Sequence, residues 1–303
     1  MPENSLFVVD FTYESMTAAF VDSEGTVRNQ SRIDLRDFLS GGSEPLDKLL
    51  SLLAAKARTA PEPVRGSAVS LPCDLDGKRR QVLAFPQANW LDGKPLPELL
   101  EKTLNAPVLM ERRGVIMLVC DQALLSLPED CLAVACYIDT HYESAIWHKG
   151  APMLGRGGGA GNIMHMTIHD REDSCFCGKS GCVDLYGAGT RLMQIQSMIF
   201  PDTPMEELFV RHSGHPIIRD YLSMMAYPIA IEADIIDPDF IIIGGAIPVI
   251  RDFPIKNLEE QILLHSYRPN PDSGPTFLAS EASVAGSLAC TAKYAMLKFQ
   301  IEF

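Results

Sequence analysis

The sequence predicts an α/β protein built from two similar halves, and two observations lead to this expectation. First, a pattern of short apolar strands, then helices, then a buried strand occurs twice, beginning near residue 5 and again near residue 132. Second, a chain of 303 residues that is 47% hydrophobic is long enough for two domains with separate cores. We therefore expect an N-terminal α/β lobe over residues 1–112, completed by a C-terminal helix at 285–303, and a second lobe over residues 113–284.

The first lobe is expected to open with a strand meander. Two apolar runs are separated by polar residues, and the turn residues Ser23, Glu24 and Gly25 follow the second run. Leucines at helical spacing then predict a helix over 45–57. The expected elements are strands at 5–10, 16–22 and 27–33, the helix at 45–57, a strand at 66–73, and a helix and strand within 97–110.

The second lobe is expected to repeat this order. Apolar alternation predicts strands at 132–139 and 143–150, and the Gly-rich stretch GRGGGAG follows at 155–161. This stretch lacks the G-K-[ST] ending of a P-loop, so a turn is the simpler interpretation. Residues 186–236 are expected to be mainly helical, and FIIIGGAI at 240–247 to be a buried strand.

Charge and hydropathy exclude two classes of partner. The chain carries 26 Lys and Arg against 39 Asp and Glu, a net charge of −13, which disfavours a nucleic-acid backbone as ligand. The longest apolar run, at 240–250, is too short for a membrane span and contains two glycines and a proline. The N-terminus has no basic and apolar regions typical of a secretion signal. We expect a cytoplasmic protein without membrane or nucleic-acid partners.

Three of the eight cysteines form a cluster. Cys175, Cys177 and Cys182 lie within eight residues in the pattern C-F-C-G-K-S-G-C, and glycines let such a loop bring its sulfurs together. Four convergent nitrogen and sulfur ligands hold structural zinc, so we expect a zinc site without a catalytic role, completed by His165 or by His169. The five other cysteines are expected to be buried apolar residues: Cys73, Cys120, Cys131, Cys136 and Cys290.

Several motifs now resemble one family. The stretch at 150–184 is similar to G-A-x…A-G-E-x-G-H…C-x-C-G-x-x-G-C-x-E, and IIDPDFIIIGGAI at 235–247 is similar to D-P-x-x-I-x-x-G-G. These are motifs of the ROK family of sugar kinases and sugar-responsive repressors, and the D-allose kinase branch is the most similar. The resemblance implies a two-lobed actin-like ATPase fold (ribonuclease H-like) of the sugar-kinase type, with a structural zinc loop. It also implies a sugar and ATP between the lobes, and a homodimer.

The resemblance also implies site residues. FPQANW at 85–90 resembles the segment that supplies a sugar-contacting Asn, here Asn89. The sugar-binding residues implied are Asn89, Arg113, Asn162, His165 and Asp184. The residues at nucleotide-binding positions are Asp10, Thr140, Gly244 and Gly245, although the two glycines also fit the end of a buried strand.

The sequence departs from the family where phosphate chemistry takes place. The first phosphate loop, D-x-G-G-T in the family, reads Asp10-Phe11-Thr12-Tyr13-Glu14, and the second, G-T-G-x-G, reads Asp139-Thr140-His141-Tyr142-Glu143. Glycine allows close approach of the backbone to a phosphate, and these loops have lost it. Arg113 takes the place of the catalytic Asp, and an arginine cannot accept the proton of a sugar hydroxyl. No catalytic residue is therefore assigned.

Three functions follow as hypotheses. The favoured one is a pseudokinase that binds zinc and a sugar or sugar derivative, with Arg113 recognising an anionic ligand or merely pairing with Glu111, Asp139 or Asp184. The second is an active hexose kinase of the D-allose type that needs ATP and magnesium, with Asp121 or Asp139 recruited as the base. The third is a NagC-like sugar-responsive regulator. Because the first strand begins within about six residues of the start, we expect no DNA-binding domain of its own.

Overall fold

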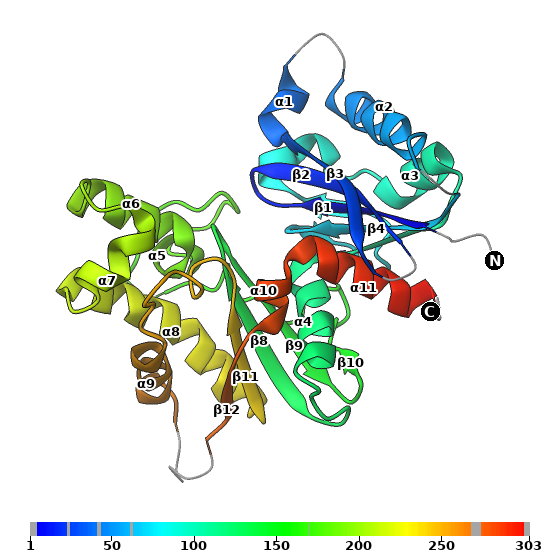
Figure 1. Cartoon of the computed structure of the whole chain (residues 1–303). Coiled ribbons are helices and arrows are strands. Elements are labelled where there is room, and N and C mark those ends of the chain that lie inside the picture. Colours follow the sequence, from blue (N-terminus) through cyan, green and yellow to red (C-terminus); the bar gives the residue numbers. More distant parts are fainter. Residues whose placement is uncertain are drawn as a thin grey trace. The chain divides into compact units, whose positions relative to one another are not determined.

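The computed structural model describes residues 5–22, 25–40, 44–60, 63–168, 170–267 and 274–299. The chain forms two compact units (Figure 1). Unit 1 comprises Met1–Leu124, Leu154–Ala160 and Val284–Phe303, and unit 2 comprises Leu125–Met153 and Gly161–Ser283.

The boundary expected at residues 112 and 113 is displaced in the structure. Helix α4 (Arg113–Leu124) continues directly from a strand of the first sheet and packs against helix α11 (Ser287–Phe299). Since α11 lies on the same sheet, both helices belong to unit 1. The short segment Leu154–Ala160 also belongs to unit 1, although the sequence assigns it to the second lobe.

Unit 1 is built on a five-stranded sheet with the strand order β3-β2-β1-β4-β7. Strands β1, β2 and β3 form the predicted antiparallel meander, and β4 and β7 run parallel to β1. The turn residues Ser23 and Glu24 lie outside the described residues. The elements are β1 (Ser5–Phe11), β2 (Ser15–Val21), β3 (Val27–Asp34), α1 (Leu35–Leu39), α2 (Pro45–Ala57), β4 (Val64–Leu71), β5 (Asp74–Leu75), β6 (Val82–Ala84), η1 (Pro86–Leu91), α3 (Leu96–Leu104), β7 (Val108–Arg112), α4 and α11.

The two faces of this sheet are covered by different helices, because successive side chains of a strand point to opposite faces. On β1, Phe7 and Val9 pack in one cluster with leucines of α2 and α3. Leu6 and Val8 face the other way and pack with Ala292 of α11. Asp10 follows Val8 by two residues along the strand, so its side chain points to the same face as those of Leu6 and Val8. It therefore lies on the face of the sheet that α11 covers.

Unit 2 repeats the arrangement of unit 1. Its sheet has the order β10-β9-β8-β11-β12, with antiparallel neighbours on one side of β8 and parallel neighbours on the other. The expected strand at 240–247 ends at Gly244, where a turn begins. The elements are β8 (Leu132–Ile138), β9 (Tyr142–His148), β10 (Ala151–Pro152), α5 (Asp184–Gly187), α6 (Gly189–Ile199), η2 (Met205–Glu207), α7 (Leu208–His212), α8 (Pro216–Ile236), β11 (Phe240–Gly244), α9 (Ile255–His265), β12 (Thr276–Ala279) and α10 (Glu281–Ala285), which extends to Ala285 across the division between the units.

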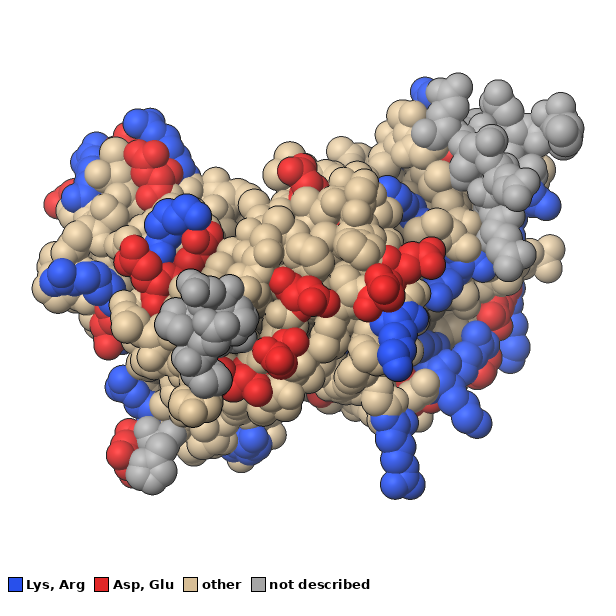
Figure 2. Space-filling view, turned by 90° about the horizontal axis from the view of Figure 1, so that it is seen from below, with Lys and Arg blue, Asp and Glu red and all other residues tan. Residues whose placement is uncertain are grey.

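The core of unit 2 lies between its sheet and its longest helix. Val134, Cys136 and Ile138 of β8 pack against buried residues of α8, such as Leu222 and Ile229. Figure 1 shows α8 and α9 side by side in this unit. Among the described helices, none has the length and hydropathy needed to cross a membrane. On the face shown in Figure 2, basic and acidic side chains are interspersed.

Candidate functional site

The cysteine loop of unit 2 brings four candidate metal ligands together. One ligand atom from each of His165, Cys175, Cys177 and Cys182 lies within 4.8 Å of the others. The Sγ atoms of Cys177 and Cys182 are 3.6 Å apart, and the Sγ of Cys175 is 3.6 Å from Nδ1 of His165. The second candidate ligand of the sequence analysis, His169, lies outside the described residues.

Two glycines allow the loop to close on itself. Gly178 and Gly181 both have positive φ, at 85° and 70°. A Cβ at Gly181 would lie 2.4 Å from the carbonyl oxygen of Arg171, so only glycine fits there. The N–H of Gly178 donates to the carbonyl of Cys175, which closes a tight turn over residues 175–178 that contains the first two cysteines. The spacing of glycines and cysteines thus produces the convergence of the sulfurs.

These four groups fit one zinc ion. Tetrahedral zinc with Zn–S bonds of about 2.3 Å holds its ligand sulfurs about 3.8 Å apart, close to the separations in this loop. Burial raises the pKa of the Cys182 thiol to about 12, so an ion that binds there displaces a proton. All four ligands come from protein, which is the arrangement of a structural site. Two of the sulfurs, those of Cys175 and Cys182, belong to buried residues.

The loop at residues 139–143 lies next to the cysteine loop. His141 contacts Phe176 of the cysteine loop edge to face, with ring centroids 5.5 Å apart. Its Nδ1 lies 2.6 Å from Oδ2 of Asp184, and Oδ1 of Asp184 accepts a hydrogen bond from the N–H of Tyr142. The side chains of His141 and Asp184 are only 11% and 2% exposed. The buried carboxylate of Asp184 therefore holds the His141 side chain away from solvent, although the sequence places this residue in a polar loop.

The polar groups of this loop are also engaged with the following elements. Oδ1 of Asp139 accepts a hydrogen bond of 2.5 Å from the N–H of Ala246. The N–H groups of Gly189 and Thr190, at the start of α6, donate to the carbonyls of Asp139 and Thr140. The N-terminus of a helix is a favoured anion site, and here the loop backbone occupies two of its donors.

Gly244 and Gly245 are both required by packing. A Cβ at Gly244 would lie 2.4 Å from Cβ of Ser280, and one at Gly245 would lie 2.5 Å from the backbone of Ile138. Gly245 has a φ of 97°, and its N–H donates to the hydroxyl of Ser283. The close contact between β11, β8 and α10 therefore explains these glycines without a nucleotide.

The turn after Asp10 in unit 1 is closed by its own hydrogen bonds. The N–H of Thr12 donates to the carbonyl of Ser15, and the hydroxyl of Thr12 accepts from the N–H groups of Glu14 and Ser15. Tyr13 is buried in the core of the unit. The hydroxyl of Ser287, on α11, donates to Oδ2 of Asp10. Three N–H groups of this turn are thus committed to the protein.

A buried ion pair lies where β7 meets α4. Glu111 and Arg112 are 3% and 6% exposed, and Arg113, the first residue of α4, is half-buried. Nε of Arg79 lies 2.6 Å from Oε1 of Glu111, with side-chain exposures of 11% and 4%. Burial raises the pKa of the Glu111 carboxyl, and the charge of Arg79 opposes that rise. Glu111 therefore pairs with Arg79, a partner that the sequence analysis did not consider.

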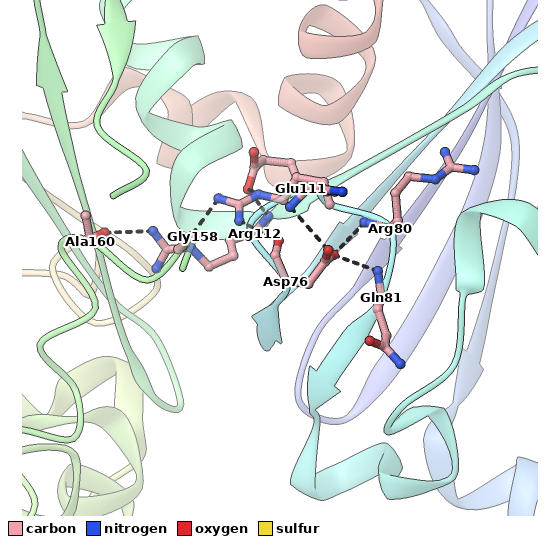
Figure 3. A network of polar contacts seen from close by, with 9 residues as sticks. Asp76, Arg80, Gln81, Glu111, Arg112, Gly158 and Ala160 are labelled. Carbon is pink, nitrogen blue, oxygen red and sulfur yellow. Dashed lines mark hydrogen bonds and ion pairs between the residues drawn. The ribbon is translucent and has the colours of Figure 1, made fainter. Parts of the chain in front are cut away.

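Arg79 and Arg112 also bind the backbone of the Gly-rich segment in unit 1. The guanidinium of Arg112 donates to the carbonyl of Ala160 at 2.9 Å, and that of Arg79 to the carbonyl of Gly158 at 3.2 Å (Figure 3). Asp76 completes the network by accepting from the N–H groups of Arg80 and Gln81. Only the fold reveals this network. In the sequence, Arg79 is 32 residues from Glu111 and 79 from Gly158, and Arg112 is 48 residues from Ala160.

The remaining site residues are not gathered in this network. Asn89 lies in the η1 turn of unit 1 with an exposed side chain. Asn162 is half-buried in unit 2, shortly before His165. Asp121, considered as a substitute base, is fully buried on α4. Because Asp139 caps the turn at Ala246, the other substitute base is also engaged.

Comparisons with known proteins agree with this fold. The curated N-acetylmannosamine kinase of Salmonella newport is 26% identical over 252 residues, which cover 78% of this chain and 86% of that protein. The xylose repressor of Caldicellulosiruptor bescii is 20% identical over 250 residues, 74% of this chain, and the chain spans only 62% of the repressor's length.

A solved structure extends the likeness in fold to nearly the whole chain. The ROK family glucokinase from Streptomyces griseus, determined with glucose and AMPPNP, has a TM-score of 0.74 and 19% identity, and the match covers 96% of this chain and 98% of that one. The sequence pattern of the ROK family matches residues 7–293. The chain therefore belongs to the ROK family and has the two-unit, actin-like α/β fold of its sugar kinases and regulators.

Proposed function

We propose that this protein is a pseudokinase of the ROK family, which binds a sugar derivative without transferring phosphate from ATP. The observation that carries the proposal is Arg113, which begins α4 where the family has its catalytic Asp. Losing a positioned general base costs about 10²–10⁴-fold in rate. The acids that the sequence offers as substitutes, Asp121 and Asp139, are buried or engaged in a turn.

The state of the two phosphate loops supports the same proposal. In the first loop, the hydroxyl and N–H groups of Thr12 bond within the turn, and Tyr13 fills the core. In the second, Asp139 and His141 occupy positions where the family has glycine. A carboxylate about 5 Å from a phosphate oxygen is repelled by roughly 3 kcal/mol at an effective dielectric constant of 20.

The distribution of charge between the units disfavours a nucleotide in unit 2 in particular. Unit 2 contains 21 Asp and Glu against 9 Lys and Arg, whereas unit 1 contains 18 against 17. The net charge of −13 therefore belongs almost entirely to the unit that carries the second phosphate loop and the paired glycines. An acidic surface lowers the local concentration of an anionic ligand such as ATP.

Calorimetry with Mg-ATP should therefore show no binding at physiological nucleotide concentrations, and incubation with ATP and hexoses should give no sugar phosphate. The hexoses tested include D-allose and glucose, the substrates expected if the protein is an active kinase. The glucokinase from Streptomyces griseus serves as the positive control. A micromolar dissociation constant for Mg-ATP would contradict the pseudokinase proposal, and phosphorylation of D-allose would identify an active hexose kinase.

Arg113 points to an anionic ligand. The junction of β7 and α4 contains the guanidinium groups of Arg112 and Arg113, and Arg79 pairs with its Glu111. A guanidinium is a planar donor suited to carboxylate and phosphate groups. We include in the proposal a sugar acid or sugar phosphate as the ligand, with Asn89, Asn162, His165 and Asp184 as further binding residues.

Thermal shift assays test this ligand class. A sugar acid or a hexose phosphate should raise the melting temperature of the wild type by a few degrees, and the effect should be lost in Arg113→Ala. Arg65→Ala is the matched control, because it removes an exposed arginine of the same unit and should keep the shift. Equal shifts by neutral glucose in the wild type and in Arg113→Ala would contradict an anionic ligand.

A sugar-responsive regulator is the second candidate function, and the likeness to xylose repressors favours it. The pseudokinase and the regulator would use the same sugar pocket, and they differ in that the regulator passes the binding of the sugar on to a partner. The homodimer implied by the family is part of both, and light scattering coupled to size exclusion measures it.

A further inference from the structure

Two cysteines that are far apart in the sequence meet inside unit 1. Cys120 lies on α4 and Cys290 on α11, and they are 3% and 0% exposed. Their Sγ atoms are 2.7 Å apart, although 170 positions separate them in the chain. This separation is only about 0.7 Å longer than the ~2.05 Å bond of a disulfide, so little movement of the helices is needed to join them.

We propose that Cys120 and Cys290 are a redox modification site, which a peroxide converts to a disulfide that ties α11 to α4. The thiolate of Cys120 attacks one oxygen of the peroxide, whose O–O bond breaks, and Cys120 becomes a sulfenic acid. Cys290 then attacks that sulfur, and the S–O bond breaks with release of water. In total, two thiols and one hydrogen peroxide give one disulfide and two water molecules, and the peroxide takes up the two electrons.

The surroundings divide these roles between the two sulfurs. The hydrogen bond from Cys290 lowers the pKa of the Cys120 thiol and outweighs burial, which raises it, while the opposing charges of Lys293 and Asp121 contribute less. The same hydrogen bond, with burial, raises the pKa of Cys290. The thiolate is the nucleophile in thiol oxidation, so Cys120 attacks first and Cys290 resolves the sulfenic acid.

The disulfide would fix a helix that packs on the central strands of the unit. Helix α11 contacts β1, β4 and α4, and Ser287 in its first turn donates to Asp10 at the end of β1. Cys290 follows Ser287 by three residues, so the bond would hold this contact in place. A cross-link that closes so long a loop also restricts the unfolded chain strongly.

Peptide mapping of the oxidised wild type tests the proposal without any variant. After treatment with millimolar hydrogen peroxide and alkylation of the remaining thiols under denaturing conditions, mass spectrometry should find the peptides of Cys120 and Cys290 joined. Dithiothreitol should separate them. The midpoint of thermal unfolding should rise by about 5 °C or more on oxidation, and hydrogen exchange of the α11 amides should slow.

Single-cysteine variants provide the controls. Cys290→Ser should abolish both the cross-link and the peroxide-dependent rise of the midpoint, whereas Cys136→Ser, at a buried cysteine in unit 2, should keep both. Zinc-loaded protein is used so that the cysteine loop is protected. Recovery of Cys120 and Cys290 as separately alkylated peptides after oxidation, or a cross-link between other cysteines in their place, would overturn the proposal. Neither result bears on the pseudokinase assignment, which calorimetry tests.

Discussion

Replacing Cys182 with serine is expected to remove zinc from the protein and to lower the free energy of unfolding by about 4 kcal/mol or more, the range typical of a lost metal site. The sulfur of Cys182 is fully buried and 3.6 Å from that of Cys177, so the substitution removes one of the four ligand atoms that converge in this loop. Elemental analysis of protein purified without added metal should give about one zinc per wild-type chain, as a four-ligand structural site requires.

The matched control for this change is Cys131→Ser. It makes the same exchange of sulfur for oxygen at another buried cysteine of unit 2, outside the cysteine loop. Its zinc content should equal that of the wild type, and its loss of stability should be smaller. If Cys182→Ser keeps a full complement of zinc, or if wild-type protein contains none and is unaffected by a chelator, the loop is not a zinc site.

The cysteine loop was predictable because all of its determinants are local. Three ligands and the two glycines with positive φ lie within eight residues, so the motif itself specifies the turn and the convergence of sulfurs. The duplicated order of strands could also be predicted, since apolar alternation indicates the strands in both halves. Both predictions depend on short-range patterns in the sequence.

The arrangement around Glu111 could not be predicted in this way. Its partner Arg79 lies 32 residues away, and the position of Arg79 depends on how the β5–β6 hairpin packs on β7. The same holds for His141, which the sequence places in a polar loop and the fold pairs with Asp184, 43 residues later. Likewise, the pairing of Cys120 with Cys290 requires two helices to meet on one face of a sheet. Partners at such distances are determined by tertiary packing.

The second large effect is expected from Arg79→Ala. The substitution leaves the carboxylate of Glu111 buried without its closest positive charge, and breaking a buried ion pair in this way costs about 3–5 kcal/mol. It also removes the hydrogen bond to Gly158, so the Gly-rich segment should become more accessible to proteases. Denaturant unfolding of the variant measures the loss of stability. Arg80→Ala is the control, because its partners Glu98 and Glu101 are partly exposed and the expected cost is roughly 1 kcal/mol or less.

The pH dependence of this loss identifies its cause. Burial already raises the pKa of Glu111, and removing the positive charge of Arg79 raises it further. A carboxyl with a raised pKa holds its proton more tightly in the folded state, so its unfavourable contribution grows as pH rises from the ordinary value near 4.3 through the raised one. The difference in stability between wild type and Arg79→Ala should therefore be large at pH ~8 and should shrink towards pH ~5. The double variant Arg79→Ala with Glu111→Gln, which carries no carboxylate at this site, should regain part of the stability and show a flat difference. A loss that is equal at both pH values would mean that lost packing of the Arg79 side chain, and not the buried charge of Glu111, destabilises the variant.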